Sequence, residues 1–508
     1  MSRRVAAAGT AVALAGALIP GPAAAHAIGG TFELPVPLSL YLAGAGLAVA
    51  ASFAVLAVAT RGVPSAARVR TVVVPVGLSR VLLLALRLLG LAWWYGAIMV
   101  GILVGDISPL PAVLLWIGIW VGLPILAVLL GNPWPSLSPF RTTFGAMEWL
   151  ARRAGILRLD LGVRYPRALA RWPAVALLAL AIWAELILPG SEAAGTVALL
   201  MAAYTLITMA GMLSFGQVAW LRHAEMFEVL LGWFGRIGPV GRQAADPALC
   251  EACEEGCDPA QCIDCAECAV VAEDDERHVV LRPWASGLLN VGTPGLSDAA
   301  FIVLALAGVT YDGLRETTVG GGLFSAIYPP VAAVLGSTST ATFLVAETAQ
   351  LLLMTAALLG AFATVVAIGR ALLGRPRAVG LGSDMGRYAV TLLPIAGGYV
   401  IAHYLTLVIQ GVVWLPSLIV DPLMSLAPQL DAIPVALVWY VSVGAIVIGH
   451  VAGIVLAHRL ARQDQPERAG LVGLPMVALM VGYTVLSLWI IAAPIVVEPG
   501  IPPSALLR

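Results

Sequence analysis

Charged residues are scarce in this chain of 508 residues, and lysine is absent altogether. Only 11% of the residues are charged, whereas roughly a quarter are charged in a typical soluble domain. This composition excludes a soluble globular protein. All 28 basic residues are arginine, and the chain is rich in alanine, glycine and valine. We attribute the missing lysine to coding bias and expect no nucleic-acid partner.

Three common enzyme signatures are also missing. The sequence contains no G-x-x-x-x-G-K-[ST] phosphate loop, no G-x-S-x-G nucleophile elbow and no H-E-x-x-H zinc motif. ATP-driven transport, a serine-esterase elbow and a zincin protease site therefore have no support in the sequence.

Long apolar runs dominate what is present, because 60% of the residues are hydrophobic. Ten of these runs approach the roughly 20 apolar residues that a helix needs to cross a lipid bilayer. We therefore predict an all-α fold, a polytopic transmembrane helical bundle with about ten spans. The predicted spans cover residues 38–60, 82–105, 110–131, 173–189, 195–213, 297–311, 341–371, 388–413, 434–458 and 471–494.

The chain begins with the pattern of an export signal. Arg3 and Arg4 form a positive region, an apolar core follows over 5–19, and three alanines at 23–25 form a small-residue cleavage site. Cleavage after the last alanine makes His26 the mature N-terminus, outside the cytoplasm. The alternative is an uncleaved anchor.

Arginine residues gather in alternate loops. Arg3 and Arg4 apart, 26 arginines remain, and 23 of them lie in loops that the ten spans place on one side of the membrane. Loops rich in arginine stay in the cytoplasm. We therefore predict a multi-pass protein of a bacterial inner (plasma) membrane. Its mature N-terminus and C-terminus lie outside, and its long central loop is cytoplasmic.

These features divide the sequence into four parts. A signal peptide (1–25) is followed by a membrane half with five spans (26–213), a polar cytoplasmic loop (214–296) and a second membrane half with five spans (297–508). Within the loop, residues 215–236 have an apolar and a polar face, which predicts an amphipathic helix lying at the membrane interface. A proline-rich stretch at 132–139 is expected to be non-helical at its start and to turn back along the bilayer surface.

The central loop also carries every cysteine of the chain. Cytoplasmic thiols stay reduced, and spaced clusters of them bind metal more often than they form disulfides. Two C-x-x-C pairs, Cys250/Cys253 and Cys262/Cys265, have a spacing that could close a tetrahedral zinc site. The last three cysteines instead resemble the start of a ferredoxin iron–sulfur motif. A flexible acidic linker without metal is the third possibility. The six cysteines are Cys250, Cys253, Cys257, Cys262, Cys265 and Cys268.

Polar residues inside the predicted spans define a second candidate site. Such residues are costly in a bilayer and often mark function. The predicted orientation places Glu347 and His403 toward the outer face, where Asp312 and Asp421 flank outer loops and the mature N-terminus also lies. Together these residues form a possible catalytic, metal or substrate site: His26, Asp312, Glu347, His403 and Asp421. A terminal histidine offers its amine and its imidazole to one cation, which suits copper or zinc. The alternative is that each residue only hydrogen-bonds a neighbouring helix.

Four short stretches carry a resemblance to a known family. They are HAIGGTFELPVPL at 26–38, YDGLRE at 311–316, AHY at 402–404 with Gln410 downstream, and SLIVDP at 417–422. As an ordered set they resemble bacterial membrane proteins of the fenitrothion hydrolase-like group. The resemblance implies an exported inner-membrane protein with organophosphate ester hydrolysis as its activity. The cysteine loop lies outside the resemblance and reads as an insertion.

Three functions remain open at this point. A hydrolase would use a metal at the outer face to activate water for attack on phosphorus. A metal or small-solute transporter, or another metal-handling membrane protein, would use the same residues as a binding site within the membrane. A membrane scaffold would recruit a partner subunit or a cytosolic protein through the loop at 214–296.

Overall fold

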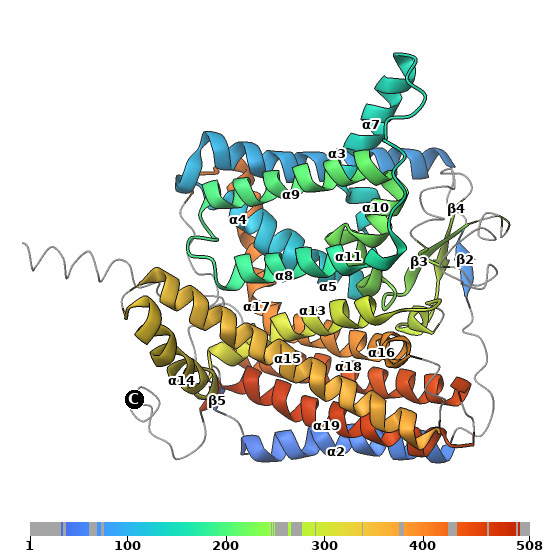
Figure 1. The fold of residues 1–508 in the computed structure, drawn as a ribbon, viewed down its shortest axis with the longest axis vertical. Coiled ribbons are helices and arrows are strands. Elements are labelled where there is room, and N and C mark those ends of the chain that lie inside the picture. Colours follow the sequence, from blue (N-terminus) through green and yellow to red (C-terminus); the bar gives the residue numbers. More distant parts are fainter. Residues whose placement is uncertain are drawn as a thin grey trace, which may run out of the picture.

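The computed structural model confirms the all-α, polytopic fold. It describes residues 32–33, 37–59, 69–72, 76–244, 246, 248, 263–265, 277–289, 291–337, 339–374, 380–424, 434–464, 467–493 and 496–497. Within these residues, ten helices are long and apolar enough to cross a membrane. Figure 1 shows most of the long helices lying roughly parallel to one another.

The first part of the chain contains both long and short helices. The long ones are α2 (Leu38–Ala59), α3 (Val76–Leu103), the rod α4–η2–α5 (Leu110–Ala112, Val113–Gly122 and Leu123–Leu129) and α9 (Ala194–Phe215). The short ones are α6 (Trp134–Leu137), α7 (Pro139–Arg153), α8 (Trp172–Leu186), α10 (Gln217–His223) and α11 (Met226–Gly235). The middle segment of the rod, η2, is wound as a π-helix.

The second part is almost entirely long helices. They are α13 (Leu296–Arg315), α14 (Thr318–Leu335), α15 (Thr340–Leu372), α18 (Val435–Asp464) and α19 (Ala469–Ala492). Between α15 and α18 the chain forms the continuous run α16–η7–α17, over Leu381–Ala389, Val390–Leu392 and Leu393–Val420.

The helices form two bundles that do not follow the sequence division at 213. The upper bundle in Figure 1 contains α3, α9 and the α4–α5 rod, and the lower bundle contains α13, α15, α18 and α19. Helix α2 belongs to the lower bundle, because its main packing partners are α19 and α18. Helix α2, from the first half of the sequence, therefore packs with helices of the second half.

Two small sheets identify the two ends of the molecule. Strand β1 (Phe32–Glu33) pairs in parallel with β5 (Val496–Val497) at one end, which we name the terminal end. Strand β4 (Arg277–Leu281) pairs antiparallel with β2 (Arg70–Val72) and β3 (Val240–Ala244) at the opposite end, which we name the sheet end. The segments before α2 and after α19 thus share one end, as the ten-span prediction requires, and the first and central loops share the other.

Helices α8 and α14 differ from the predicted spans. Helix α8 covers 15 residues, about 22 Å, which is less than the ~30 Å core of a bilayer. Helix α14 occupies a stretch that was expected to be an outer loop. The Gln350 side chain donates to the Gly320 carbonyl at 3.0 Å, and Phe324 packs on Phe343. Helix α14 therefore lies antiparallel along the first turns of α15, at the terminal end.

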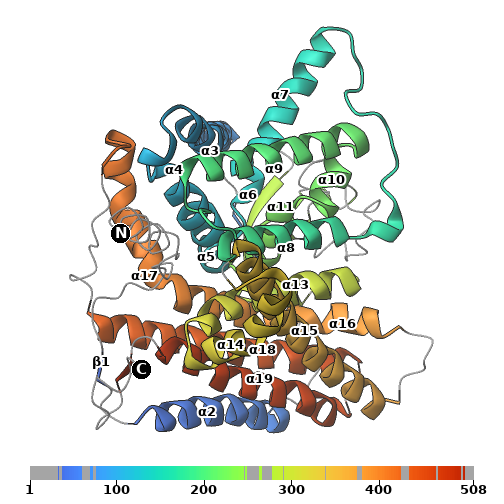
Figure 2. The ribbon, with the colours of Figure 1, turned by 60° about the vertical axis from the view of Figure 1, so that its left-hand side comes forward.

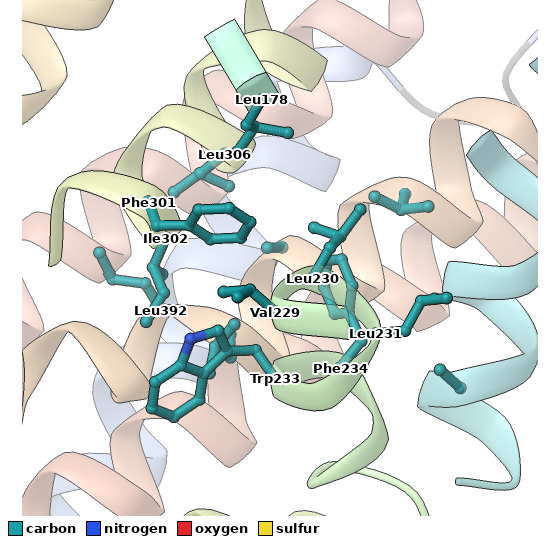
Figure 3. Close-up of a cluster of buried hydrophobic side chains, with 14 of the residues drawn as sticks. Leu178, Val229, Leu230, Leu231, Trp233, Phe234, Phe301, Ile302, Leu306 and Leu392 are labelled. Atoms are coloured by element: carbon teal, nitrogen blue, oxygen red, sulfur yellow. The ribbon is translucent and has the colours of Figure 1, made fainter. Parts of the chain in front are cut away.

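The prediction that residues 215–236 form one helix at the membrane interface is wrong. The stretch breaks into α10 and α11, and α11 packs inside the molecule against α5, α8 and α17. Its polar residues are not turned to water, because Glu225 and Glu228 are buried against partners from distant segments. Figure 3 shows the apolar side of α11, where Val229 and Leu230 face side chains of α13 such as Phe301. The core thus lies where the two bundles meet.

The proline-rich stretch at 132–139 is more helical than expected. Prolines occupy the first positions of α6 and α7, where a missing N–H costs no hydrogen bond. Ser138 caps α7 by accepting from the Arg141 amide at 3.3 Å. From there α7 leaves the bundle nearly at right angles to the long helices (Figures 1 and 2).

Candidate functional site: a buried ionisable cluster between the bundles

Helices α8, α13, α15 and α17 bring a set of ionisable side chains together where the two bundles meet. One turn of α13 supplies three of them, and the other helices supply carboxylates, an imidazole and a phenol. We name this set the Asp312 cluster: Glu185, Tyr311, Asp312, Arg315, Glu347, His403 and Tyr404.

Asp312 lies at the centre of the cluster. Its Oδ2 contacts His403 Nε2 at 3.0 Å and accepts from the Tyr404 hydroxyl at 2.9 Å. Asp312 is 2% exposed and His403 is 6% exposed. Tyr399, one turn earlier on α17, stacks on the imidazole with an interplanar angle of 8°. The imidazole is thus held between an aromatic ring and a carboxylate, which fixes its orientation.

Gly313 allows α13 and α17 to approach closely enough for this contact. A Cβ atom at this position would lie 3.2 Å from His403 Cε1 and 2.9 Å from the Tyr399 hydroxyl. Both distances are shorter than an ordinary van der Waals contact, so any larger residue would push the imidazole away from Asp312.

Arg315 is the permanent cation of the cluster. Its Nε lies 3.5 Å from Asp312 Oδ1 and 3.6 Å from Glu316 Oε1, and its Nη1 donates to the Leu186 carbonyl at 2.6 Å. Glu316 follows the end of α13. Burial raises the pKa of its carboxyl, and the charge of Arg315 opposes that rise.

Glu347 joins the cluster through Tyr311. The Tyr311 hydroxyl donates to the Glu347 carboxylate, and Tyr311 directly precedes Asp312 on α13. Glu347 is also close enough to Arg315 to interact with it electrostatically. The carboxylates in and beside this cluster therefore outnumber its one arginine.

A small cavity extends from the cluster toward α11. It measures about 40 Å³, with Glu185, Tyr404 and Trp120 on one side and Leu230 and Phe234 on the other. Trp120, on the π-helical segment, donates to Glu185 Oε2 at 2.5 Å. A cavity of this size has room for at least one water molecule.

The structure brings together some of the residues selected from the sequence. Asp312 and His403 are in contact, and Glu347 on α15 accepts from the hydroxyl of Tyr311, the residue before Asp312 on α13. Asp421 is elsewhere: it is exposed at the end of α17, and its Oδ1 accepts from the Leu423 amide at 3.1 Å. His26 lies outside the described residues.

Sequence reasoning missed Arg315, Tyr311 and Tyr404 as members of the cluster. A signal for them was available, because Asp312 and Arg315 are three residues apart and lie on one face of a helix. Tyr404 directly follows His403 on α17. Both side chains reach the Asp312 carboxylate because α13 packs closely against α17. That approach is a tertiary feature.

The metal predictions fall largely outside the part of the chain that the structure describes. Among the described residues, no three His, Cys, Asp or Glu side chains converge to hold a metal ion. Five cysteines lie outside: Cys250, Cys253, Cys257, Cys262 and Cys268. Cys265 is described and buried, next to Asp264, which accepts from the Arg242 amide and pairs with Arg282 at 2.7 Å. Zinc or an iron–sulfur centre in this loop remains a prediction.

A second buried polar group lies between the Asp312 cluster and the sheet end. Glu225, between α10 and α11, accepts from Trp134 Nε1 at 2.9 Å, from the Tyr204 hydroxyl and from two backbone amides. Burial raises its pKa to about 7. Glu228 pairs with Arg141, with Nη2 to Oε1 at 2.7 Å. Glu225 and Glu228 were expected on the solvent-facing side of an interfacial helix.

Comparisons of the chain with protein-family models, with curated proteins and with solved structures find no match.

Proposed function

We propose that this protein moves a small cation across the membrane, coupled to protons, with the Asp312 cluster as its binding site. One observation carries the proposal: Asp312, bound by His403 and Tyr404, is buried between two helical bundles. Ionisable residues at such positions mark ion pathways and proton relays in membrane proteins. The excess of carboxylates over arginine favours a cationic solute.

The energetics of the cluster favour a functional role over a structural one. Burying charges removes them from water, and the attraction between partners often only offsets that cost. Apolar side chains of similar size would hold α13 and α17 together at least as well. We therefore assign Asp312 and His403 to ligand and proton binding.

The position of the cluster suits alternating access. Helix α17 packs on α18 in the lower bundle and on the π-helical segment η2 in the upper one, so it joins the two. A movement of one bundle against the other would open the cluster to one side and then to the other.

Proton flux into proteoliposomes tests the proposal. The purified protein is reconstituted with the pH dye pyranine inside, and a pH gradient is imposed with and without an external divalent cation such as Mn²⁺. Asp312→Asn removes the charge that receives the proton, so we expect cation-dependent proton flux to fall by at least about tenfold, the effect of roughly 1.4 kcal/mol on a rate.

Asp421→Asn is the matched control, because this exposed aspartate lies outside the cluster. It should leave the flux unchanged. A wild-type protein that shows no cation-dependent proton flux, or a fully active Asp312→Asn variant, would contradict the proposal.

Phosphotriester hydrolysis at the same cluster is the second proposal. It is supported by the family resemblance and by the Asp312–His403 pair, in which a carboxylate orients an imidazole as in a general base. Arg315 lies beside the pair and suits a developing phosphoryl charge. Copper or zinc bound with the help of His26 would supply an activated water.

Hydrolysis of a p-nitrophenyl phosphotriester in detergent separates the two proposals, because no gradient is needed. Under the hydrolase proposal, the wild-type protein releases nitrophenol with added Zn²⁺ or Cu²⁺, and His403→Gln loses most of this activity. No release by the wild-type protein under these conditions would rule the hydrolase out and leave the transport assay unaffected.

A further inference from the structure

Helix α7 and the segment that follows it have an unusual placement. The first turns of α7 are fixed in the protein: Phe140 and Phe144 are fully buried, and Arg141 pairs with Glu228. The rest of the helix extends sideways beyond α3 and α9, nearly at right angles to the long helices, as both ribbon views show. It therefore runs in the direction of a membrane surface.

The projecting part exposes large apolar side chains. Trp149 and Leu150 on α7 are about half exposed, and Leu157 in the following segment is 94% exposed. Ile156, Leu161 and Val163 are at least 49% exposed as well. Water alone would disfavour so much contiguous apolar surface.

The same stretch is strongly basic. Residues 140–171 contain seven arginines and only two acidic residues, Glu148 and Asp160. Both acidic residues already have an arginine partner, at 3.9 Å for Arg152 and 2.7 Å for Arg158. Arg153 stacks over the Trp149 ring at 4.0 Å. Tryptophan and arginine together are typical of the headgroup region of a bilayer.

The level of α7 along the molecule agrees with such a position. Its base adjoins the sheet end, because Arg242 on β3 donates to Ser136 Oγ, just before α7, at 2.8 Å. The sheet end is where the long helices leave the bilayer and where arginine-rich loops collect. A helix at this level, perpendicular to the spans, lies at the bilayer surface.

We infer that α7 and residues 154–167 form an interfacial anchor that binds the anionic phospholipids of the leaflet at the sheet end. The apolar side chains enter the acyl layer, and Arg152, Arg153, Arg164 and Arg167 bind headgroup phosphates. Basic clusters next to membrane spans attract anionic lipids in this way. The Arg141–Glu228 pair would join the anchor to α11 inside the molecule.

Photocrosslinking in the full-length protein tests the anchor. p-Benzoylphenylalanine in place of Leu157 is irradiated in nanodiscs of phosphatidylcholine with phosphatidylglycerol added, and adducts are identified by mass. We expect phospholipid adducts enriched in phosphatidylglycerol. The same probe in place of Leu199, which is 71% exposed in the span α9, should crosslink to lipid without that enrichment.

A charge variant supplies the second measurement. Replacing Arg152, Arg153, Arg164 and Arg167 by Gln should lower the phosphatidylglycerol retained by the purified protein by up to about fivefold for each arginine lost. Arg80→Gln, an exposed arginine of α3, should have a much smaller effect. Crosslinks from position 157 to a protein, or an absence of lipid adducts there while position 199 still labels lipid, would overturn the inference.

Discussion

At the scale of single residues, hydrogen-bond donors and counter-charges stabilise buried charges of this protein. Glu225 illustrates this best. Four groups donate to its carboxylate, and they come from α6, from α9 and from the first turn of α11. These bonds favour the ionised form, but burial has the larger effect and raises the pKa to about 7.

The raised pKa of Glu225 predicts a pH dependence of stability. Between pH 4.5, the ordinary pKa of a glutamate, and pH 7, the folded state holds a proton that the unfolded state has released. The stabilisation from this group is therefore complete below the unfolded pKa and is lost as the pH rises through 7. The full loss is about 3 kcal/mol. Thermal unfolding in detergent at a series of pH values measures it.

Glu225→Gln is the variant that isolates this effect. The amide cannot ionise, so its melting temperature should vary less between pH 6 and 8 than that of the wild type. The melting temperature of the variant should also be lower than that of the wild type, because the Gln NH₂ group would face hydrogen-bond donors where the carboxylate accepted. An identical pH profile in both proteins would show that Glu225 does not titrate in this range.

At the scale of helices, close approach depends on a few glycines. Helices α17 and α18 form the most extensive helix pair in the described structure. At their crossing, a Cβ on Gly449 would lie 2.4 Å from the Pro394 carbonyl oxygen, and a Cβ on Gly453 would lie 2.8 Å from that of Thr391. The two glycines are four residues apart, the small-residue spacing of packed membrane helices.

Gly449→Ala is predicted to destabilise the protein and to displace His403. The added methyl group meets backbone atoms, which cannot rotate away, so α17 must move. Overpacking of this kind costs about 1–3 kcal/mol. Gly444→Ala on the same helix is the matched control, because nothing lies within 4 Å of its Cβ position. Equal melting temperatures for the two variants would contradict the close crossing.

At the scale of the whole molecule, α2 packs with α19, the first and last helices of the described residues. A Cβ on Gly46 of α2 would lie 3.7 Å from Val481 Cγ1 on α19. Cysteines at these two positions should therefore form a disulfide under mild oxidation, in a variant whose native cysteines are serines. A pair at Gly46 and Leu206, on the exposed face of α9, should not. Crosslinking of the second pair alone would show a different arrangement of the bundles.

The orientation in the membrane is a separate prediction. The arginine-rich loops and the sheet end should face the cytoplasm, because positive charge resists export. A fluorescent protein fused after Glu255 should fluoresce, and alkaline phosphatase fused after Gly336, where α14 ends, should be active. Reporter activity of the opposite sense at both positions would reverse the assignment of the two ends.

The sequence by itself determined the fold class and the approximate spans. A membrane helix satisfies its own backbone hydrogen bonds, and its length and apolar character are local properties that a run of residues displays directly. Because the sequence displays only such local properties, its predictions for α8 and α14 were inaccurate. Helix α8 stops short of a full span, and α14 is apolar enough for a span but lies beside α15 at the terminal end.

Only the tertiary structure decided which polar residues meet. His403 and Asp312 are 91 residues apart in the sequence, and Arg141 and Glu228 are 87 apart. A polar helix face has the same sequence pattern whether it faces water or a buried partner. Residues 215–236 were therefore predicted to lie at the membrane surface. The partner that draws α11 inward is on another helix, and a local pattern carries no information about it.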